Sequence, residues 1–418
     1  MPQDPLHLLC IEPRFPGRLG WVADWLVRHR GYRATFFCHS AEPQARWPES
    51  TGRGLEVIAY NVGGIAKEGS VPWTRVFERG LCHAFGCWEV LDARRIRPVD
   101  AILGRTDGLG SSLFASVSYP HVPVMQWFDY YFPAHLHDLA DEATDATPIA
   151  FHHWRRATNA IDLIDLENGV YPWTPTAWQK SLYPREYQDD FLVLHDGVDT
   201  RLFRPRSGST SPPVEIAGRP VPNAAKVVSF IARSPDRLRG FDRFIDLVSA
   251  LQRDDPGLIA IVVGDSEVHH SVDFTFHGRD YASALLAERP SIDPDRLWRL
   301  GSASRGQVAQ VLARTDLHVV PGRTYPVARS TIEAMASGAP ILAVDNEPIR
   351  EVLENDRTAL LSNPENLIET ARRALKDPEG LEPLGKAAAE VARARFSRDV
   401  TLPRLAEHLQ RLVERGVG

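Results

Sequence analysis

The sequence predicts an α/β protein with two doubly wound domains, each a parallel sheet with helices on both faces. Short apolar runs alternate with amphipathic helical patterns in both halves of the chain, which is typical of parallel strands joined by right-handed crossovers. A stretch rich in Pro, Gly and Ser at residues 204–225 interrupts this alternation once. The length of 418 residues fits two or three domains of ordinary size. We therefore expect two domains joined by a linker.

The N-terminal domain, expected over residues 1–203, begins with apolar runs of strand length. Its predicted strands are Leu8–Ile11, Ala34–Cys38, Val57–Tyr60, Ala101–Leu103 and Val122–Phe128. A first helix is predicted at Trp21–His29, because Trp21, Trp25 and Leu26 recur on one helical face.

The C-terminal domain, expected over residues 226–396, repeats the same alternation. Its predicted strands are Val227–Ile231, Leu258–Val263, Leu317–Val320 and Ile341–Val344, with helices at Phe241–Leu251 and Ser330–Ala336. Residues 397–418 are expected to form a C-terminal helix that packs across both domains. The residues at helical spacing are Leu402, Leu405, Leu409 and Leu412. Such sheets bind ligands at the carboxyl ends of their strands, so we expect the site in a cleft between the domains.

Composition excludes several classes of protein. Hydrophobic residues make up 43% and charged residues 24%, which is ordinary for a globular protein and unlike a disordered chain. The net charge of −6 argues against a nucleic-acid partner. No apolar run approaches the roughly 18 residues of a membrane span, and the N-terminus lacks the pattern of a signal peptide. We expect a cytoplasmic protein with at most peripheral membrane association.

No metal site is expected. The four cysteines have no metal-binding spacing and are expected to be reduced thiols: Cys10, Cys38, Cys82 and Cys87. Two pairs of adjacent histidines diverge on any regular element, namely His152/His153 and His269/His270. The motif Asp293-Pro-Asp295 is interpreted as a helix cap before a short helix at Arg296–Arg299.

Two arginines follow the predicted strand Val227–Ile231. Arg233 and Arg239 lie in a loop that leads to Gly240 and a helix, a position that suits a phosphate. The planar guanidinium donates two hydrogen bonds to one phosphate. The alternative is that both are solvated loop arginines.

A second candidate segment, residues 321–340, runs from a strand end into a helix. Ser330 with Glu333 three residues later has the spacing of a capping box, which is a structural reason for the glutamate. The functional alternative is that the helix N-terminus faces a diphosphate while Glu333 binds ribose hydroxyls. Tyr325 and Arg329 lie in the same segment and are candidate substrate contacts.

A third candidate is the turn at residues 14–20, between the first strand and the first helix. Gly17 would let the backbone approach a phosphate, and Arg18 follows it. A tight connection between strand and helix explains the glycine equally well.

Taken together, these stretches resemble the retaining GT-B glycosyltransferases of family 4. The resembling segments, which cover most of residues 190–400, are His195–Pro205, Arg233–Phe241, Val263–Asp265, Asp316–Pro321, Glu333–Pro340, Pro348–Val352 and Asn355–Leu361. Trp173–Gln179 also resembles a bacterial subgroup of the family. The remainder of the N-terminal half matches only in its alternation of strands and helices.

The resemblance implies a nucleotide-diphosphate sugar as donor substrate, bound mainly by the C-terminal domain, and no cofactor. Arg233 matches the family's phosphate-binding arginine, and Arg239 lies where a lysine is usual. Glu333 matches the second acid of the E-x7-E motif, which contacts the ribose. Gly17 matches a glycine loop that closes over the diphosphate. The acceptor is expected to be a glycan, a lipid-linked sugar or a small molecule.

The sequence departs from the family pattern at two positions. Tyr325 replaces the first acid of E-x7-E, which normally contacts the donor sugar. Asp129 lies where many relatives have an active-site histidine, and Tyr130 follows it. Since the resemblance places the donor on the C-terminal domain, the N-terminal half becomes the acceptor side, and of the ten Trp residues only Trp298 lies outside it, after position 200. Aromatic rings stack on sugars, so Trp127 and Trp88 are candidate wall residues of an acceptor groove.

The resulting prediction is a metal-independent glycosyltransferase that retains the anomeric configuration and acts in polysaccharide biosynthesis. Charge on the leaving diphosphate would be stabilised by Arg233, Arg239 and a helix N-terminus. Tyr325 motivates one alternative, a degenerate subunit that binds a sugar or a partner without transfer. A nucleotide-sugar epimerase is another, because fold alone does not separate these activities.

Overall fold

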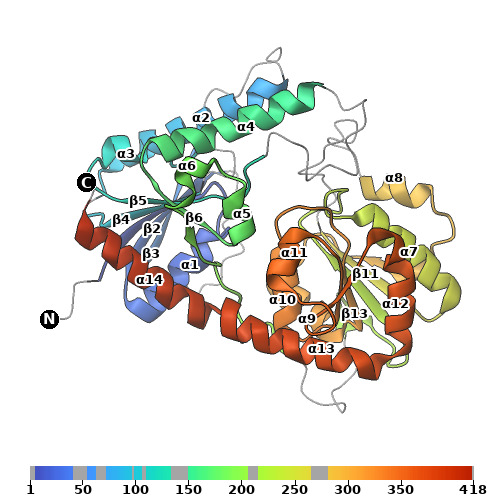
Figure 1. Cartoon of the computed structure of the whole chain (residues 1–418). Coiled ribbons are helices and arrows are strands. Elements are labelled where there is room, and N and C mark those ends of the chain that lie inside the picture. The colour runs from blue at the N-terminus through green and yellow to red at the C-terminus, as the bar shows by residue number, and fades with distance from the viewer. Residues whose placement is uncertain are drawn as a thin grey trace. The chain divides into compact units, whose positions relative to one another are not determined.

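The structure is a computed structural model that describes residues 5–40, 54–62, 72–96, 98–105, 110–132, 149–205, 215–264 and 281–416. The described residues fall into two compact units, each with its own parallel sheet (Figure 1). The described chain up to Asp196 belongs to the first unit, which it rejoins at Thr401, and Gly197–Val400 belongs to the second.

The first unit contains a parallel sheet whose described strands run in the order β3-β2-β1-β4-β5-β6-β7. They are β1 (His7–Ile11), β2 (Arg33–His39), β3 (Leu55–Tyr60), β4 (Ala101–Arg105), β5 (Val124–Trp127), β6 (Tyr171–Thr174) and β7 (Leu192–Val193). β1 pairs with both β2 and β4, so the order of strands reverses there. Loops at the carboxyl ends on either side of such a reversal form a ligand-binding crevice in doubly wound folds.

Helices cover both faces of this sheet (Figure 1). Their bounds are α1 (Leu19–Arg30), α2 (Pro72–Arg94), α3 (Ala115–Ser118), α4 (Ile149–Glu167), α5 (Ala177–Ser181), α6 (Arg185–Gln188) and α14 (Arg398–Arg415). Leu26 of α1 packs with Phe36 in one buried cluster, and Leu91 of α2 packs with Ile102 in another. α1 ends at Gly31, whose φ of 70° closes the helix with a left-handed residue.

The C-terminal helix α14 returns to the first unit. Its apolar residues are buried in the same cluster as α1, as their helical spacing predicts: Leu402, Leu405, Leu409 and Leu412. The helix begins within the second unit, because Arg398–Val400 belongs there.

The second unit repeats this architecture with its own parallel sheet, in the order β12-β11-β10-β13-β14-β15. Its strands are β10 (Val227–Ile231), β11 (Ile259–Val263), β12 (Leu297–Arg299), β13 (Leu317–Val320), β14 (Ile341–Val344) and β15 (Leu360–Ser362). Its helices are α7 (Phe241–Asp254), α8 (Tyr281–Ala287), α9 (Arg305–Arg314), α10 (Arg329–Ala336), α11 (Glu347–Val352), α12 (Leu367–Lys376) and α13 (Pro378–Val391). α9, α10 and α11 pack on one face, and α7 and α12 pack on the other.

The described residues 215–225 differ from the linker that the composition of residues 204–225 predicts. Residues 215–220 form a small hairpin of β8 (Glu215–Ile216) and β9 (Arg219–Pro220). Ile216 and Val221 are buried in the core of the second unit, together with Phe203. Pro and Gly mark these turns because the chain reverses direction within a folded unit.

The segment after Asp293 also differs from its prediction. Asp293 caps as expected, because its side chain accepts the backbone N–H of Asp295. The cap serves only a short 3₁₀ turn, and the expected helix at Arg296–Arg299 is strand β12. Trp298 and Leu297 of that strand are buried against the two faces of the sheet.

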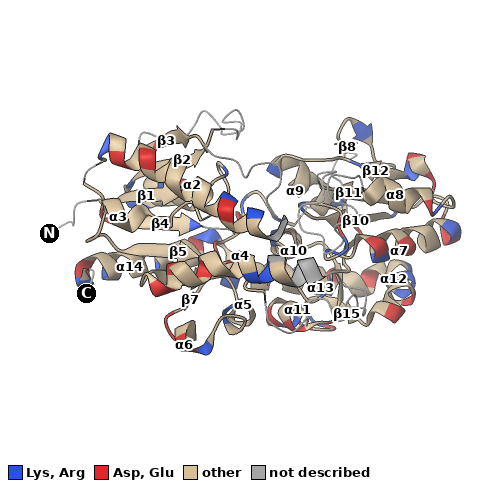
Figure 2. Ribbon diagram, turned by 90° about the horizontal axis from the view of Figure 1, so that it is seen from above, with Lys and Arg blue, Asp and Glu red and all other residues tan. Residues whose placement is uncertain are grey.

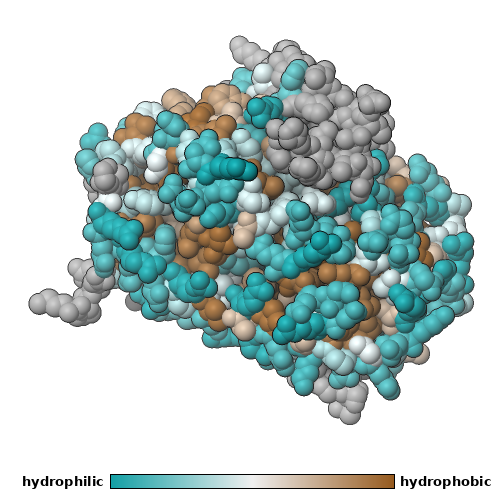
Figure 3. Space-filling view, viewed as in Figure 1, coloured by the Kyte–Doolittle hydropathy of each residue, from teal (hydrophilic) through white to brown (hydrophobic). Residues whose placement is uncertain are grey.

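The surface is that of an ordinary globular protein. Acidic and basic residues are interspersed along α7 and α12 (Figure 2), and hydrophilic residues dominate the face in Figure 3, broken by small hydrophobic patches. In the described residues, no helix combines the length and the apolar character needed to cross a bilayer. The four cysteines form no disulfide, and Cys10, Cys38 and Cys87 are buried.

His318 in β13 makes the stability of the second unit sensitive to acid. Its ring is buried, Nδ1 lies 2.9 Å from Ser229 Oγ, and burial lowers its pKa to about 4. Since the unfolded pKa is near 6.5, the stabilisation by neutral His318 is complete above that pH and is lost as the pH falls toward 4. The expected loss is about 3 kcal/mol.

Urea unfolding followed across this pH range measures the effect. His318→Gln should flatten the pH dependence of the free energy of unfolding, while the exposed His121→Gln should leave it unchanged. Equal slopes for wild type and His318→Gln would show that His318 does not titrate in this way.

Candidate functional site

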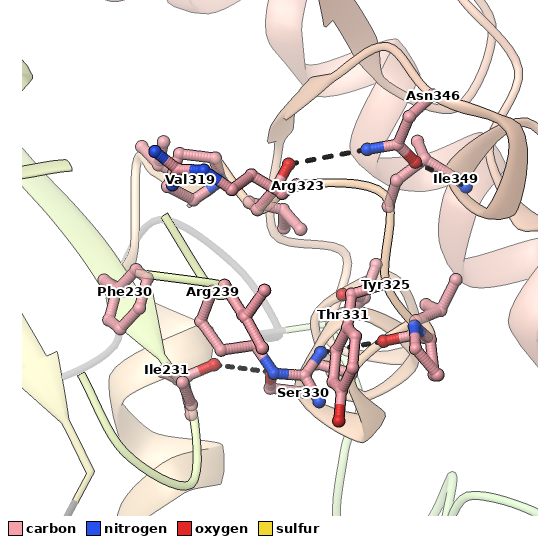
Figure 4. A pocket seen from close by; sticks show the side chains of 18 of the residues that line it. Phe230, Ile231, Arg239, Val319, Arg323, Tyr325, Ser330, Thr331, Asn346 and Ile349 are labelled. Carbon is pink, nitrogen blue, oxygen red and sulfur yellow. Dashed lines mark hydrogen bonds between the residues drawn. The ribbon is translucent and has the colours of Figure 1, made fainter. Parts of the chain in front are cut away.

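A pocket in the second unit lies where β10 and β13 end and α10 begins (Figure 4). Its walls are mostly apolar, and its polar side chains are those of Arg239, His318, Arg323, Tyr325, Ser330, Thr331 and Asn346. Among its described lining residues, the two arginines are the permanent cations and there is no Asp or Glu. The pocket is therefore suited to an anion.

Arg239 reaches this pocket from the loop between β10 and α7. Its Nη1 donates to the carbonyl of Pro326 at 2.7 Å, and its guanidinium carbon lies 4.8 Å from the ring centroid of Tyr325. Figure 4 shows the guanidinium beside that ring. The backbone N–H of Arg239 donates to the buried carboxylate of Asp236 at 2.9 Å. Side chain and backbone together fix the position of this arginine.

Arg323 lines the pocket, but its guanidinium is engaged by a neighbouring carboxylate. Its side chain is buried and forms a two-pronged pair with the Asp242 carboxylate, at 3.1 and 2.9 Å. Burial raises the pKa of Asp242, but the hydrogen bonds and charge of Arg323 outweigh burial and lower it overall. The charge of Arg323 is compensated by this pair, whereas the described side-chain contacts of Arg239 are with a carbonyl and an aromatic ring. Burial raises the pKa of Asp236, and the charge of Arg239 opposes that rise.

Gly240 lets the Arg239 loop pack closely on the loop after β13. Its φ is +76°, and a Cβ there would collide with the carbonyl group of Pro321. A side chain at this position would therefore push the two loops apart.

The N-terminus of α10 faces the same pocket. The helix begins at Arg329, and its N-cap residue Ala328 provides no side-chain hydrogen bond. Thr331 in the first turn is fully buried, and its hydroxyl has no hydrogen-bond partner. Uncapped N–H groups and an unpaired hydroxyl are suited to a phosphate.

The capping box expected at Ser330 and Glu333 is absent. Ser330 lies inside the helix, and its hydroxyl donates to the carbonyl of Ile231 at 2.6 Å, which ties α10 to the end of β10. Glu333 is buried, with Oε1 3.5 Å from Nη2 of Arg305. A capping box does occur at Ser304 and Gln307 of α9.

The pocket gathers some of the predicted donor contacts and not others. Arg239, Tyr325 and Ser330 line it. Arg233 is exposed in the loop after β10 and is not among the lining residues, and neither is Glu333. Thr331 is the residue that sequence reasoning missed, because a threonine inside a helix gives no signal of an unpaired hydroxyl.

A second cluster of charges lies in the first unit, at the carboxyl ends of β1 and β4. Glu12 is buried and accepts the backbone N–H groups of Arg18 (2.9 Å) and Leu19 (2.8 Å), so its carboxylate occupies the N-terminus of α1. Gly17 has a φ of +54°, and a Cβ there would collide with that carboxylate. These contacts explain the glycine without a phosphate.

Two arginines connect Glu12 to the predicted residue Asp129. Arg105 donates to Glu12 at 2.7 Å and to Asp129 at 3.2 Å. Arg18 donates to the buried Asp196 at 3.1 Å, and its Nη2 lies 3.8 Å from Asp129. The Asp129 side chain is 27% exposed, so it is the accessible end of a mostly buried ion network.

The expectation that Trp127 lines a sugar groove does not fit its position. The ring is fully buried, packs edge-on against Trp173, and has the Arg18 guanidinium over its face. Trp178 is instead the half-buried tryptophan near Asp129, stacked with Tyr130 at 6.2 Å. Trp88 lies on α2 beside the exposed Phe85.

Among the residues that the structure describes, no group of three or more His, Cys, Asp or Glu side chains comes together to hold a metal. His269 and His270 lie outside the described residues, as does the side chain of His152.

Comparison with protein-family models places both units. Residues 30–203 match the Glycosyl transferase family 4 group, and residues 215–391 match Glycosyl transferases group 1. Between them, the two matches cover most of the chain. The chain belongs to the group 1 glycosyltransferases. A relative, the sulfoquinovosyl transferase SQD2 of Arabidopsis thaliana, is 24% identical over 205 residues, which are 47% of this chain and 36% of that protein. The chain therefore matches little more than a third of that relative's length.

Solved structures show that the fold is GT-B. Sucrose-phosphate synthase from Thermosynechococcus elongatus superposes with a TM-score of 0.70 at 17% identity, covering 98% of this chain and 100% of that one. HepE from Anabaena, in complex with UDP and glucose, has a TM-score of 0.68 at 17% identity, covering 97% and 99%. WaaG, a glycosyltransferase of lipopolysaccharide biosynthesis, has a TM-score of 0.66 at 15% identity, also covering 97% and 99%.

Proposed function

We propose that this group 1 glycosyltransferase binds a nucleoside-diphosphate sugar in the pocket of the second unit and transfers its sugar to an acceptor. The observation that carries the proposal is the acid-free pocket at the N-terminus of α10. Arg239 and the unpaired hydroxyl of Thr331 lie together there. A diphosphate supplies both the charge and the hydrogen-bond acceptors that these groups lack.

The chemistry follows from these positions. When the bond between the anomeric carbon and the diphosphate breaks, negative charge develops on the phosphate oxygens. Arg239, the Thr331 hydroxyl and the N-terminus of α10 stabilise that charge and so favour departure of the nucleoside diphosphate. These groups counter part of the negative charge of the leaving group, and we expect turnover to persist in a chelator.

The finer parts of the proposal rest on the resemblances. HepE, which has the same fold, is known in complex with UDP-glucose, and this supports a UDP-sugar as the donor. The family resemblance supports retention of the anomeric configuration and a glycan, lipid-linked or small-molecule acceptor. We assign the acceptor to the first unit, where Asp129 is the accessible carboxylate of the ion network. Catalysis and substrate contacts by Arg233, Arg18, Arg329, Tyr130 and Glu333 stay part of this proposal.

The proposal is tested by measuring the thermal stability of the full chain with a panel of nucleoside diphosphates and their nucleosides. At least one diphosphate should raise the melting temperature, because a ligand that binds only the folded state stabilises it. Its nucleoside should give a much smaller shift. If no diphosphate in the panel raises the melting temperature, the assignment of the donor pocket is wrong.

Thr331→Val should change the stability of the chain and its affinity for the diphosphate in opposite directions. Removing the unpaired buried hydroxyl should stabilise the ligand-free chain, because such a group costs about 1–3 kcal/mol. The same change should weaken diphosphate binding about tenfold, because a hydrogen bond to a charged group is lost. Calorimetry and thermal unfolding measure the two effects.

A matched control for this variant is available in the first unit. Thr174 in β6 is also fully buried with an unpaired hydroxyl. Thr174→Val should raise stability in the same way and leave diphosphate affinity unchanged. If both variants bind the diphosphate as wild type does, Thr331 does not contact the ligand.

A further inference from the structure

We propose that Tyr325 is a positioning residue that holds the guanidinium of Arg239 against its ring and keeps that cation available to the diphosphate. The inference rests on the proposed function and adds a role for one side chain of this chain. Tyr325 and Arg239 line the same pocket, and the guanidinium carbon lies 4.8 Å from the ring centroid. This distance is within the range of cation–π contacts.

The ring fixes the arginine on one side, and the backbone fixes it on another. Nη1 of Arg239 donates to the carbonyl of Pro326, the residue directly after Tyr325. One short segment therefore orients the guanidinium through two contacts, both with uncharged groups. An arginine held in this way loses less conformational freedom when it binds a phosphate, which favours affinity.

The pair between Arg323 and Asp242 shows what a carboxylate at position 325 would do to Arg239. Arg323 is paired with both oxygens of Asp242, and its charge is compensated. Asp236, the acid in the loop of Arg239, is buried and accepts the Ser234 hydroxyl and the Arg239 backbone N–H. An aromatic ring at 325 orients Arg239 without neutralising it, whereas a carboxylate there would form a pair that competes with the diphosphate.

The test uses the full-length chain with UDP, GDP and ADP, and with the corresponding nucleosides, by isothermal titration calorimetry. Tyr325→Phe keeps the ring and should bind the diphosphate as wild type does. Tyr325→Leu removes the ring and should weaken diphosphate binding by about five- to thirtyfold. The affinity for the nucleoside should not change in either variant. A general loss of structure would weaken nucleoside binding as well.

Two further variants make the result specific. Tyr325→Glu should weaken diphosphate binding more than Tyr325→Leu does, and should reduce the dependence of the affinity on salt, because Arg239 is then paired. In an Arg239→Ala background, Tyr325→Leu should have no further effect, since the ring acts through the arginine.

The outcomes separate the inference from the proposed function. If wild type binds none of the three diphosphates, the proposed function fails and this inference fails with it. If wild type binds one of them and Tyr325→Leu binds it equally well, the inference alone is wrong. It is also wrong if Tyr325→Leu weakens binding by the same factor with and without Arg239, or if Tyr325→Glu binds as tightly as wild type.

Discussion

Arg239→Ala is expected to lower kcat/KM for turnover of the nucleotide sugar by about 100- to 1,000-fold, the effect of removing one preorganised donor from a developing anion. Arg239 is the arginine of the pocket whose described side-chain contacts are both uncharged, a carbonyl and an aromatic ring. The loss should appear mainly in kcat, because charge on the diphosphate increases as the glycosidic bond breaks. Release of nucleoside diphosphate, followed by chromatography, measures it.

Two variants control for this result. Arg357→Ala removes an exposed arginine that pairs with Glu354 at 2.6 Å, and should leave turnover unchanged. Arg239→Lys keeps the charge at a position where the family resemblance implies a lysine, and should retain most of the activity. An Arg239→Ala enzyme with the activity of wild type would exclude a catalytic role for this residue.

Glu12→Gln is expected to lower the free energy of unfolding of the first unit by about 3–5 kcal/mol, because it removes the buried carboxylate that pairs with Arg105 and leaves that guanidinium facing the partly exposed Asp129. Glu12 is 2% exposed, accepts two backbone N–H groups at the start of α1 and pairs with Arg105. Glutamine keeps the size of the side chain but removes its charge. Urea unfolding followed by tryptophan fluorescence reports mainly on this unit, since Trp298 alone lies after residue 200.

The matched control is Glu89→Gln on the exposed side of α2, which should change stability by less than about 0.5 kcal/mol. A second check is a double variant in which Arg105, the partner of Glu12, also loses its charge. Adding Arg105→Gln to Glu12→Gln should cost less than the sum of the two single changes, because no buried charge is then left unpaired. Additive losses would show that the two side chains do not act as a pair.

Much of the fold was predictable because the strands are apolar on both faces. All residues of β10 are buried, as are all those of β13 except Val320, and such continuous apolar runs identify buried parallel strands. β7, with only two residues, lacks such a run, and Leu297–Arg299 was mistaken for a helix. Composition did not distinguish the described hairpin at residues 215–220 from a linker, since both kinds of segment contain Pro and Gly.

The candidate site was predictable only where spacing determines position. Arg233 follows the end of β10 almost directly but does not line the pocket, whereas Arg239 lines it from the position before Gly240, the N-cap of α7. A cation at a strand end is a better guide at β4, because Arg105, the last residue of that strand, is the partner of Asp129. Ser330 and Glu333 misled because the spacing of a capping box also occurs inside a helix. The burial of Trp127 could not be predicted from the sequence, because a strand buried on both faces shows no alternation of apolar and polar residues.

We propose that this chain takes the sugar of a nucleotide sugar and transfers it to an acceptor. The most direct test incubates the full chain with the nucleotide sugar whose diphosphate stabilises it most, without acceptor, and follows both products by mass spectrometry and NMR. We expect slow release of nucleoside diphosphate and free sugar, abolished by Arg239→Ala and unchanged by Arg357→Ala. Recovery of an uncleaved nucleotide sugar with one stereocentre of the sugar inverted would identify an epimerase. Complete absence of turnover, with the nucleotide sugar still bound, would identify a binding subunit. Either result would contradict transfer.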